Sequence, residues 1–554
     1  MASKEKQFRV AILCRGYSFD AWEAECIRQV MSLPFVEIVL LIAEPEEENI
    51  SKNILHKLSH YPYRNILWRF YKRFKIKIDA YKTVSLEAEL KDTPLIYCKA
   101  ELKGKYSQYF SEIDLDKIKS HQPDVLLRFA YNILRGEILT VAKHGVWSYH
   151  HADEQIIRGG PAAFWEIHNK IPVTGAILQR LTEKLDSGII LRKGYFKTIS
   201  RSYSVNLVQL IKGSTSWMKQ ALIDLANGNL PANLESQEKS SAKVYSFPTN
   251  AQMIRAWRIS KAAKMKFHWH ELFQPEQWNV GILKQNPSEI ISKGITSKIE
   301  WLPEPKTNEY YADPFGWRDE NELKIVFEHY NYKKQKGIIA SYNSNGEIKT
   351  VLEKTNHLSY PFVFNVNGKK AIMPECFESK NLFFFDVNNP QEEKIIIENI
   401  DAVDSTPVFH NNRWWIFCTL ADEFSNTNLF LYHSEKIDGA WIAHENNPVK
   451  CDIRSSRPGG TPFVLNGKLF RPAQDCSTSY GSAIVINEIV LLDENSFSER
   501  IVARIEPYIN SKYNKGIHTF SLVDNNTILL DGKRYVYNFD NFKNVFKRKL
   551  ARIF

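Results

Sequence analysis

The chain has 554 residues, of which 44% are hydrophobic and 25% are charged, and this ordinary globular composition excludes a largely disordered protein. At roughly 150 residues per domain the length predicts two to four domains. The net charge of +10 is mild for this length and does not by itself indicate nucleic-acid binding, while the 13% of aromatic residues favours a large β-rich region.

The sequence shows no targeting or membrane-spanning pattern. Apolar runs are far shorter than the roughly 20 residues that a membrane-spanning helix needs. The first residues, MASKEKQ, lead directly into a strand-like stretch and do not resemble a secretory signal. Seven cysteines occur without a CxxC pair, which favours reduced thiols over a disulfide scaffold or a zinc knuckle. We therefore expect a cytoplasmic protein.

The N-terminal region alternates apolar, β-branched runs with segments of helical periodicity, a pattern typical of a parallel α/β sheet. Pro123 stands just before one of these runs, where its missing N–H group is tolerated. The predicted strands are 8–14, 35–43 and 123–129, and the predicted helices are 18–33, 114–120 and 133–143.

Polar residues gather after the next predicted strand. Ser148, His150 and His151 lie at its end, an Arg158-Gly159 turn follows, and Asp186 opens a later Asp-Ser-Gly loop. Open α/β sheets bind ligands at the carboxyl ends of their strands. The sequence therefore places a candidate site here.

These residue types suit acyl transfer to an amine. An imidazole can move the proton from the attacking amine, and a carboxylate can orient the ring and raise its pKa. We predict His150 as the general base and acid and Asp186 as its partner. An Asp-Ser-Gly loop can also be a simple turn, and two histidines can be ordinary polar surface. Neighbouring strand residues point to opposite faces, so no metal site is expected.

The ordered set of His150, Arg158-Gly159 and Leu185-Asp186-Ser187-Gly188 resembles the formyltransferase family that uses 10-formyltetrahydrofolate. The resemblance spans about residues 8–210 and implies a Rossmann-like formyltransferase domain over 1–240. It implies 10-formyltetrahydrofolate as co-substrate, with no metal. The segment that it places at the pterin pocket contains Phe129, Ala130, Tyr131, Ile133 and Leu134.

The chain departs from this family at one position. The family's asparagine, which the resemblance implies stabilises the oxyanion, falls on Ser148. Loss of such a donor typically costs about 100- to 1000-fold in rate. Ser148 could donate only to a shifted substrate or through water, and a protonated His151 is another donor that the site offers.

Two basic-aromatic stretches have two interpretations. Residues 61–82 and the C-terminal FKNVFKRKLARIF could lie on an anionic membrane surface, with rings at headgroup level. The same stretches could be exposed helices whose lysines extend their charged ends into water.

A polar stretch marks the end of the N-terminal region, and 241–274 is predicted to be a linker. Short strands separated by turns then form similar units roughly 50 residues apart. These units indicate an all-β five-bladed propeller over 275–540, followed by a basic tail at 541–554. They begin at Asp313, Tyr360, Thr406, Thr461 and His518.

This half resembles the propellers of glycoside hydrolase family 43 and the related module of glucosamine inositolphosphorylceramide transferases, on Tyr311-Ala-Asp313-Pro-Phe and the repeats. That resemblance implies an acidic residue on each of three blades, but Tyr360 and Thr406 replace two of them. Sugar binding is therefore favoured over cleavage. A propeller used only for docking or oligomerisation is the alternative. Glu328, Glu375 and Asp475 are candidate replacement acids, and Arg457, Arg471, Gln474 and His518 are candidate binding residues.

Together the two resemblances predict an N-formyltransferase that acts on an amino sugar, nucleotide- or lipid-linked, in surface polysaccharide synthesis. The predicted substrate-binding residues are Arg158, Gly159, Asp313, Glu375, Arg471 and His518. We expect no nucleic-acid partner, and leave peripheral membrane contact and oligomerisation open. The alternatives are another acyl transfer or deformylation at the altered Ser148/His151 site, and a carbohydrate-binding or glycosyl-transferring protein with a silent N-terminal domain.

Overall fold

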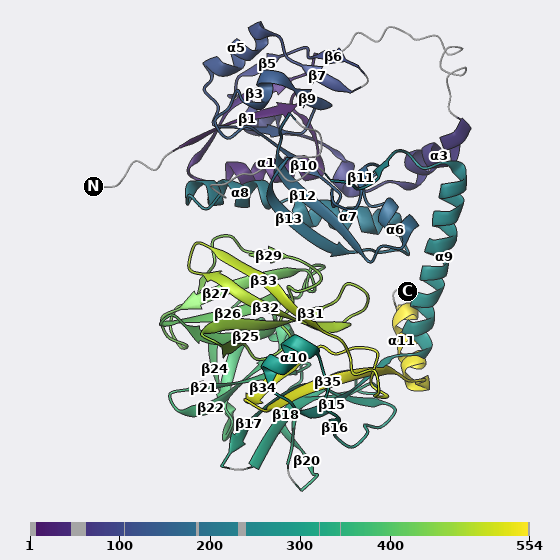
Figure 1. Cartoon of the computed structure of the whole chain (residues 1–554), viewed down its shortest axis with the longest axis vertical. Coiled ribbons are helices and arrows are strands. Elements are labelled where there is room, and N and C mark those ends of the chain that lie inside the picture. Colours follow the sequence, from purple (N-terminus) through teal and green to yellow (C-terminus); the bar gives the residue numbers. More distant parts are fainter. Residues whose placement is uncertain are drawn as a thin grey trace. The chain divides into compact units, whose positions relative to one another are not determined.

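A computed structural model describes residues 7–45, 63–104, 106–183, 188–230, 240–320, 322–343 and 345–551. The chain divides into two compact units (Figure 1). The first comprises Met1–Gly194 and Thr198–Ala263, and the second comprises Tyr195–Lys197 and Lys264–Phe554.

The first unit is built on a seven-stranded sheet whose order is β13-β12-β10-β8-β1-β3-β5. The central strands are parallel, and β12 runs antiparallel to β10. The apolar runs seen in the sequence are buried here, so the predicted α/β fold class is confirmed. The strands are β1 (Phe8–Cys14), β3 (Val36–Ala43), β5 (Leu95–Tyr97), β8 (Val125–Arg128), β10 (Val146–His150), β12 (Val173–Arg180) and β13 (Ile189–Lys197).

Helices supply the rest of this core. In α1 the side chain of Asp20 and that of Glu23 form a capping box, and in α5 Ser111 caps the N-terminus. The main helices are α1 (Ala21–Met31), α3 (Ile66–Lys75), α5 (Glu112–Ser120), α6 (Trp165–Asn169), α7 (Tyr203–Ser214) and α8 (Trp217–Ala226).

The predicted helix over 133–143 is wrong. Ile133–Arg135 forms the short strand β9, which pairs with β7 (Ser107–Tyr109), and a 3-10 turn follows at Gly136–Leu139. Gly136 has a φ of 76°, in the left-handed region that interrupts a helix.

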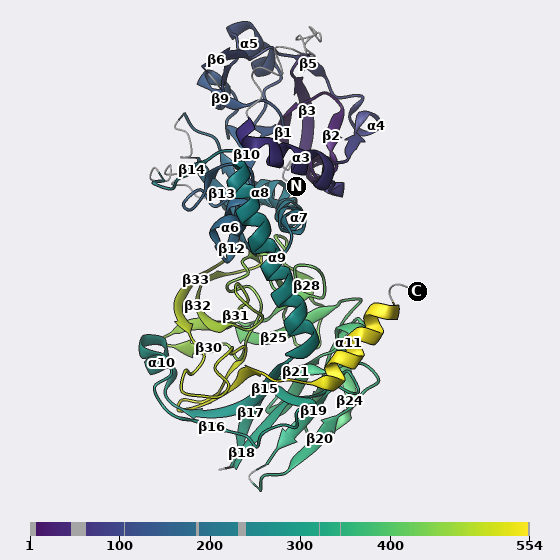
Figure 2. The same cartoon turned by 90° about the vertical axis from the view of Figure 1, so that its right-hand side faces the viewer.

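The segment predicted to be a linker contains a helix of 24 residues, α9 (Asn250–Phe273). The sequence did not reveal it because its apolar residues do not gather on one face, and only Met253 and Ala256 are buried. The C-terminal helix α11 (Phe539–Ala551) packs against the end of α9 (Figure 2), where the rings of Phe273 and Phe542 stack at 5.4 Å. The predicted basic tail therefore begins within a helix.

The second unit is all-β, as predicted. Its described residues form five antiparallel sheets, and the last sheet combines strands from both ends of the unit in the order β16-β15-β35-β34. The other four sheets are consecutive in the chain. Their strands are β17 (Glu309–Asp319), β18 (Glu322–Asn331), β19 (Lys336–Tyr342) and β20 (Ile348–Leu352); β21 (Ser359–Val366), β22 (Lys369–Glu375), β23 (Asn381–Asp386) and β24 (Asn389–Glu398); β25 (Ala402–His410), β26 (Arg413–Leu420), β27 (Asn428–Ser434), β28 (Ile442–Ala443) and β29 (Lys450–Cys451); and β30 (Phe463–Leu465), β31 (Lys468–Asp475), β32 (Ala483–Leu492) and β33 (Phe497–Ile505). The shared sheet contains β15 (Glu276–Lys284), β16 (Ile299–Trp301), β34 (Phe520–Asp524) and β35 (Thr527–Tyr535).

The first strands of three sheets share a bulge of one extra residue. The bulge puts Asp313, Tyr360 and Asp404 in the left-handed region, with φ of 51°, 42° and 51°. These three residues are therefore structural equivalents. Thr406, which the sequence repeat paired with Asp313 and Tyr360, lies two residues beyond the equivalent position.

All seven cysteines are buried and free of disulfides, as the scattered spacing predicted. Among the described residues, no helix is both long enough and apolar enough to span a membrane.

Candidate functional site

A polar pocket of about 260 Å³ lies at the starts of the inner strands of the second unit. Five carboxyl side chains, four of them buried, meet there with one arginine and two histidines. Its lining is Glu276, Trp278, Tyr310, Ala312, Asp313, Glu328, Tyr332, His357, Ser359, Glu375, Asp404, Arg457, Tyr480 and His518. We call it the central pocket.

One side of the central pocket is organised by Asp404. The Arg457 side chain donates to its carboxylate at 2.6 Å, and the Gln474 amide donates to the same oxygen at 2.8 Å. The backbone N–H of Asp404 donates to the Glu375 carboxyl at 3.0 Å. A buried ion pair of this kind is specific in geometry, because both charges have lost their water.

The opposite side is organised by His518. Its imidazole lies 2.5 Å from Asp531 and 3.4 Å from Asp313, and all three are buried. Although burial alone would lower it, the two carboxylates raise the pKa of His518 above its ordinary value. The three residues could also hold a cation, since their ligand atoms lie within 4.8 Å of one another.

Three carboxyl groups of the central pocket have raised pKa values. Burial, followed by the charges of Asp313 and Glu375, raises the pKa of Glu328 well above its usual value. Burial, followed by the charge of Asp404, does the same for the pKa of Glu375. Burial raises the pKa of Asp313 to about 6, against the opposing effect of His518. The pocket therefore places carboxyl groups that hold their protons more strongly than usual beside Asp404, which Arg457 binds.

Aromatic side chains give the pocket apolar faces. The Trp278 indole stacks on His518 at 4.0 Å, and Arg457 lies 5.2 Å from the centre of the Tyr480 ring. The Tyr310 hydroxyl donates to Glu328 at 3.2 Å. Rings beside hydrogen-bonding groups suit a sugar, which has both apolar faces and hydroxyl edges.

The structure gathers some predicted residues and separates others. Asp313, Glu375 and His518 line the central pocket, as do Glu328 and Arg457. Arg471 does not: it is fully buried and binds Glu499 at 2.6 and 3.0 Å. Asp475, proposed as a replacement acid, instead pairs with Arg504.

Sequence reasoning missed Asp404, Trp278 and Tyr480. The repeat was aligned on prolines, but Pro314 and Pro361 lie within the bulge, whereas Pro407 is paired with Ile416 beyond it. A signal existed in the acidic residue that follows the apolar pair at Ala402-Val403.

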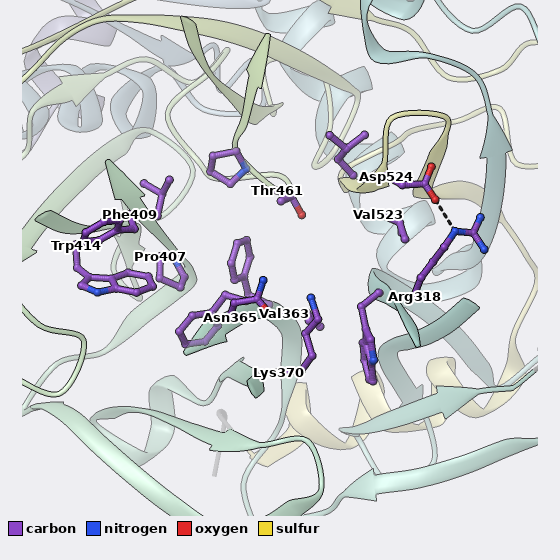
Figure 3. A pocket seen from close by; sticks show the side chains of 17 residues that line it. Arg318, Val363, Asn365, Lys370, Pro407, Phe409, Trp414, Thr461, Val523 and Asp524 are labelled. Carbon is purple, nitrogen blue, oxygen red and sulfur yellow. Dashed lines mark hydrogen bonds and ion pairs between the residues drawn. The ribbon is translucent and has the colours of Figure 1, made fainter. Parts of the chain in front are cut away.

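A second pocket, of about 520 Å³, is lined by residues of β17, β21, β22, β25, β26 and β34 and by Thr461 and Pro462, which precede β30 (Figure 3). Its lining mixes aromatic, basic and apolar side chains. Arg318 is paired with Asp524 at 2.6 Å, and the Lys370 amine points into the opening. Burial lowers the pKa of Lys370.

A third pocket, of about 550 Å³, lies in the first unit, where β8 and β10 end. We call it the α/β pocket. Ser148, His150, Gly159, Ile133 and Leu134, all singled out from the sequence, line it. The Ser148 hydroxyl is engaged, because it accepts from Arg128 at 2.8 Å and donates to the Tyr149 carbonyl at 3.3 Å.

Other predicted residues lie elsewhere. His151 is not among the lining residues of the α/β pocket. It stacks on Tyr149 at 5.7 Å, and burial, followed by the charge of His150, lowers its pKa to about 4. It is therefore neutral near pH 7 and is not the protonated donor considered above. Asp186 lies outside the described residues. Phe129, Ala130, Tyr131 and Arg158 are not among the lining residues of this pocket.

Comparison with known proteins links the second unit to one family. Residues 298–528 match the family described as glucosamine inositolphosphorylceramide transferase 1, N-terminal. A protein from Arabidopsis thaliana named glucosamine inositolphosphorylceramide transferase 1 is 32% identical over 256 residues, which are 40% of this chain and 33% of that protein. The protein of the same name from Oryza sativa subsp. japonica is 31% identical over 208 residues, 34% of this chain and 27% of that protein. The chain thus spans about a third or less of the length of these relatives.

Solved structures give weaker similarities. Glycinamide ribonucleotide transformylase 1 from Symbiobacterium toebii aligns with 41% of this chain and 92% of its own, at 12% identity and a TM-score of 0.29. A thermostable family-43 glycoside hydrolase aligns with 37% of this chain and 80% of its own, at 12% identity and a TM-score of 0.29. Such scores do not assign either unit to a family.

The prediction of a folate-dependent N-formyltransferase is wrong on these findings. The relatives are named for glucosamine and inositolphosphorylceramide, and their names do not include formyl transfer or a folate. The similarity agrees better with the alternative of a carbohydrate-binding or glycosyl-transferring protein.

Proposed function

We propose that the central pocket binds a sugar and that the chain takes part in glycosyl transfer. The observation that carries this proposal is the group of four buried carboxyl side chains, Asp313, Glu328, Glu375 and Asp404, around one pocket with aromatic walls. The names of the relatives support a transferase and point to a glucosamine-type sugar.

The protonation pattern supports this chemistry. Glycosyl chemistry uses one carboxylic acid that protonates a leaving oxygen and one carboxylate that acts as base or stabilises positive charge. Glu328 and Glu375, whose pKa values are raised, suit the first role. Asp404, which is paired with Arg457, suits the second. The Asp404 carboxyl would also attract the ammonium group of a glucosamine.

The five sheets also support a five-bladed propeller as the arrangement that builds this pocket. Four of the sheets contribute residues to the second pocket, including Arg318, Lys370, Trp414 and Asp524, and Thr461 lies just before the first strand of the fifth sheet. A pocket that several sheets of the unit line together is typical of sheets arranged around one axis.

Direct binding tests the sugar site. The purified chain is titrated by calorimetry with glucosamine, N-acetylglucosamine and glucose. We expect saturable binding with glucosamine preferred, and roughly tenfold or greater weakening in Glu375→Gln, which removes an acidic hydroxyl donor, and in Asp404→Asn, which removes a carboxylate acceptor. Glu435→Gln, an exposed residue outside the pocket, is the matched control. Absence of binding to all three sugars at millimolar concentration would overturn the proposal.

A transfer assay separates glycosyl transfer from sugar recognition alone. Nucleotide-linked glucosamine and inositolphosphorylceramide are incubated with the chain, and the lipid is analysed by mass. A gain of one hexosamine that Glu328→Gln and Glu375→Gln abolish would support catalysis. Sugar binding without that product would reduce the proposal to recognition.

Contact with an anionic membrane surface stays a prediction, as does the cytoplasmic location. The helix α3 lies in the stretch on which the membrane prediction rests.

A further inference from the structure

Arg128, the last residue of β8, reaches across the carboxyl edge of the sheet in the first unit. One guanidinium nitrogen donates to the Ser148 hydroxyl at 2.8 Å. The other terminal nitrogen donates to the backbone carbonyls of Tyr131 and Asn132 at 2.8 and 2.7 Å. All of these acceptors are uncharged groups. They fix the position of the Arg128 guanidinium but do not balance its positive charge.

The charge of Arg128 lacks an acidic partner among the described residues. Within the described ranges no ion pair includes this side chain, and its buried Nε–H has no hydrogen-bond acceptor. Burial alone lowers the pKa of Arg128 to about 10, which still leaves it charged at neutral pH. Arg128 is half-buried, and a partly desolvated cation without an acidic partner favours the binding of an anion.

The surroundings agree with this requirement. Arg128 and Arg135 both line the α/β pocket, and none of its described lining residues is acidic. The remaining wall is largely apolar, with Ile133, Leu181 and Phe247 among its members. At about 550 Å³ the pocket has the volume typical of small-molecule sites.

We propose that the α/β pocket binds a small organic anion whose carboxylate or phosphate group pairs with the Arg128 guanidinium and whose apolar or aromatic body lies against the pocket wall. Arginine suits either group because its planar donors match their oxygens. This site belongs to the first unit and is independent of the sugar site proposed for the second.

The alternative is a purely structural role for Arg128. Its bonds to the carbonyls of Tyr131 and Asn132 fix a loop in which Tyr131 has a φ of 67°. That role requires hydrogen bonds but does not require an anion. Binding of charged and neutral probes of one shape therefore separates the two roles.

The test is calorimetric titration of the full chain with phenyl phosphate, benzoate and benzyl alcohol at constant ionic strength. We expect saturable binding of at least one anion and at least tenfold weaker binding of benzyl alcohol. The preferred anion identifies the ligand as a phosphate or a carboxylate. Equal binding of all three probes, or no binding of either anion at millimolar concentration, would overturn the proposal.

Two variants locate the anion. Arg128→Met keeps the length of the side chain but removes its charge, and we expect about 10- to 100-fold weaker anion binding, the range for lost hydrogen bonds to charged groups. Arg128→Lys keeps the charge and should retain part of the affinity even if Arg128→Met disturbs the loop. Arg201→Met, an exposed arginine outside the pocket, is the control. Unchanged binding in a folded Arg128→Met protein would contradict the site.

Discussion

Arg457 and Arg471 are arginines of the second unit that bind carboxylates in different places. Arg457 binds Asp404 at the wall of the central pocket. Arg471 binds Glu499 away from the pocket, where Lys450 also reaches the same carboxylate at 2.7 Å. The sequence showed two arginines near repeats and could not tell these places apart, because each depends on a carboxylate distant in the chain.

The structural role of Arg471 predicts a loss of stability without a loss of sugar binding. Arg471→Met removes one partner of a buried ion pair and should lower the free energy of unfolding by about 3 kcal/mol. Denaturant unfolding measures this change. In Arg471→Met/Glu499→Leu/Lys450→Met much of the loss should be recovered, because all three members of the ion-pair network are removed together. A fall in sugar affinity in the single variant, with stability unchanged, would contradict this assignment.

The raised pKa values of the pocket carboxyls predict how stability depends on pH. Between the unfolded pKa of a glutamate, about 4.3, and its raised folded value, the native state binds more protons than the unfolded state. Stability therefore falls as pH rises through this window, by up to about 1.4 kcal/mol per pH unit for each fully shifted group. The raised pKa of His518 acts in the same direction, because its contribution is lost as pH rises through its folded value.

Glu375→Gln tests this dependence, because glutamine resembles the protonated carboxyl and does not titrate. We expect the variant to lose less stability than the parent chain between pH 5 and pH 8, as measured by scanning calorimetry. Glu435→Gln should follow the parent chain. An equal loss of stability in Glu375→Gln and the parent chain would show that Glu375 is ionised in the native state over this pH range.

At the scale of elements, α3 joins a buried anchor to an exposed basic-aromatic face. Trp68 is 4% exposed and packs against Phe164 and Tyr203, whereas Phe70 and Phe74 are 61% and 58% exposed and stack on each other at 6.0 Å. Basic residues occupy the last turn of the helix. The sequence predicted the composition of this face, but only the structure shows which aromatic side chain is anchored.

The exposed pair of α3 makes membrane contact testable. Phe70→Ser/Phe74→Ser removes two large rings from the face but leaves its charges, and it should weaken binding to vesicles containing phosphatidylserine by about tenfold or more. Vesicle sedimentation measures the effect. Trp68→Ser is unsuitable as a control because Trp68 belongs to the core, so the exposed Tyr97→Ser serves instead. Equal binding of the parent and double-variant chains would contradict the membrane prediction.

The periodicity of apolar residues predicted some helices and strands correctly and missed others. The strands of the first unit were clear because their apolar runs are buried on both faces. The helix α9 was missed because long, partly exposed helices lack an apolar stripe. In the second unit the repeat predicted the number of sheets. A bulge of one residue in the first strands of three sheets could not be seen in the sequence and shifted the third site residue from Thr406 to Asp404.

At the scale of the whole molecule, the second unit is completed by a sheet that joins its two ends. In this sheet β15 pairs with β35 along nine residues, and Lys533 binds Glu276 at 2.9 Å across 257 residues of sequence. His518, which precedes β34, lines the central pocket, and Asp531 of β35 holds its imidazole. The pocket therefore depends on this long-range pairing.

Truncation tests that dependence. A chain that ends at Ile509 lacks β34 and β35, leaves β15 without its main partner, and should lose the cooperative unfolding transition of the second unit and all sugar binding. A chain that ends at Tyr537 lacks only α11 and should retain both. Calorimetry and sugar titration measure the outcome. A cooperative transition and normal sugar affinity in the shorter chain would show that the shared sheet is dispensable.

The shared sheet cannot form until β35, near the end of the chain, has been synthesised. At about 5 to 20 residues per second, a ribosome needs roughly 12 to 50 seconds to make the 257 residues between Glu276 and Lys533. During that interval β15 has left the ribosome but its partner does not yet exist, so its hydrogen-bonding edge is open to other chains. Newly made copies of this protein therefore depend on dilution or on chaperones until the last strand emerges.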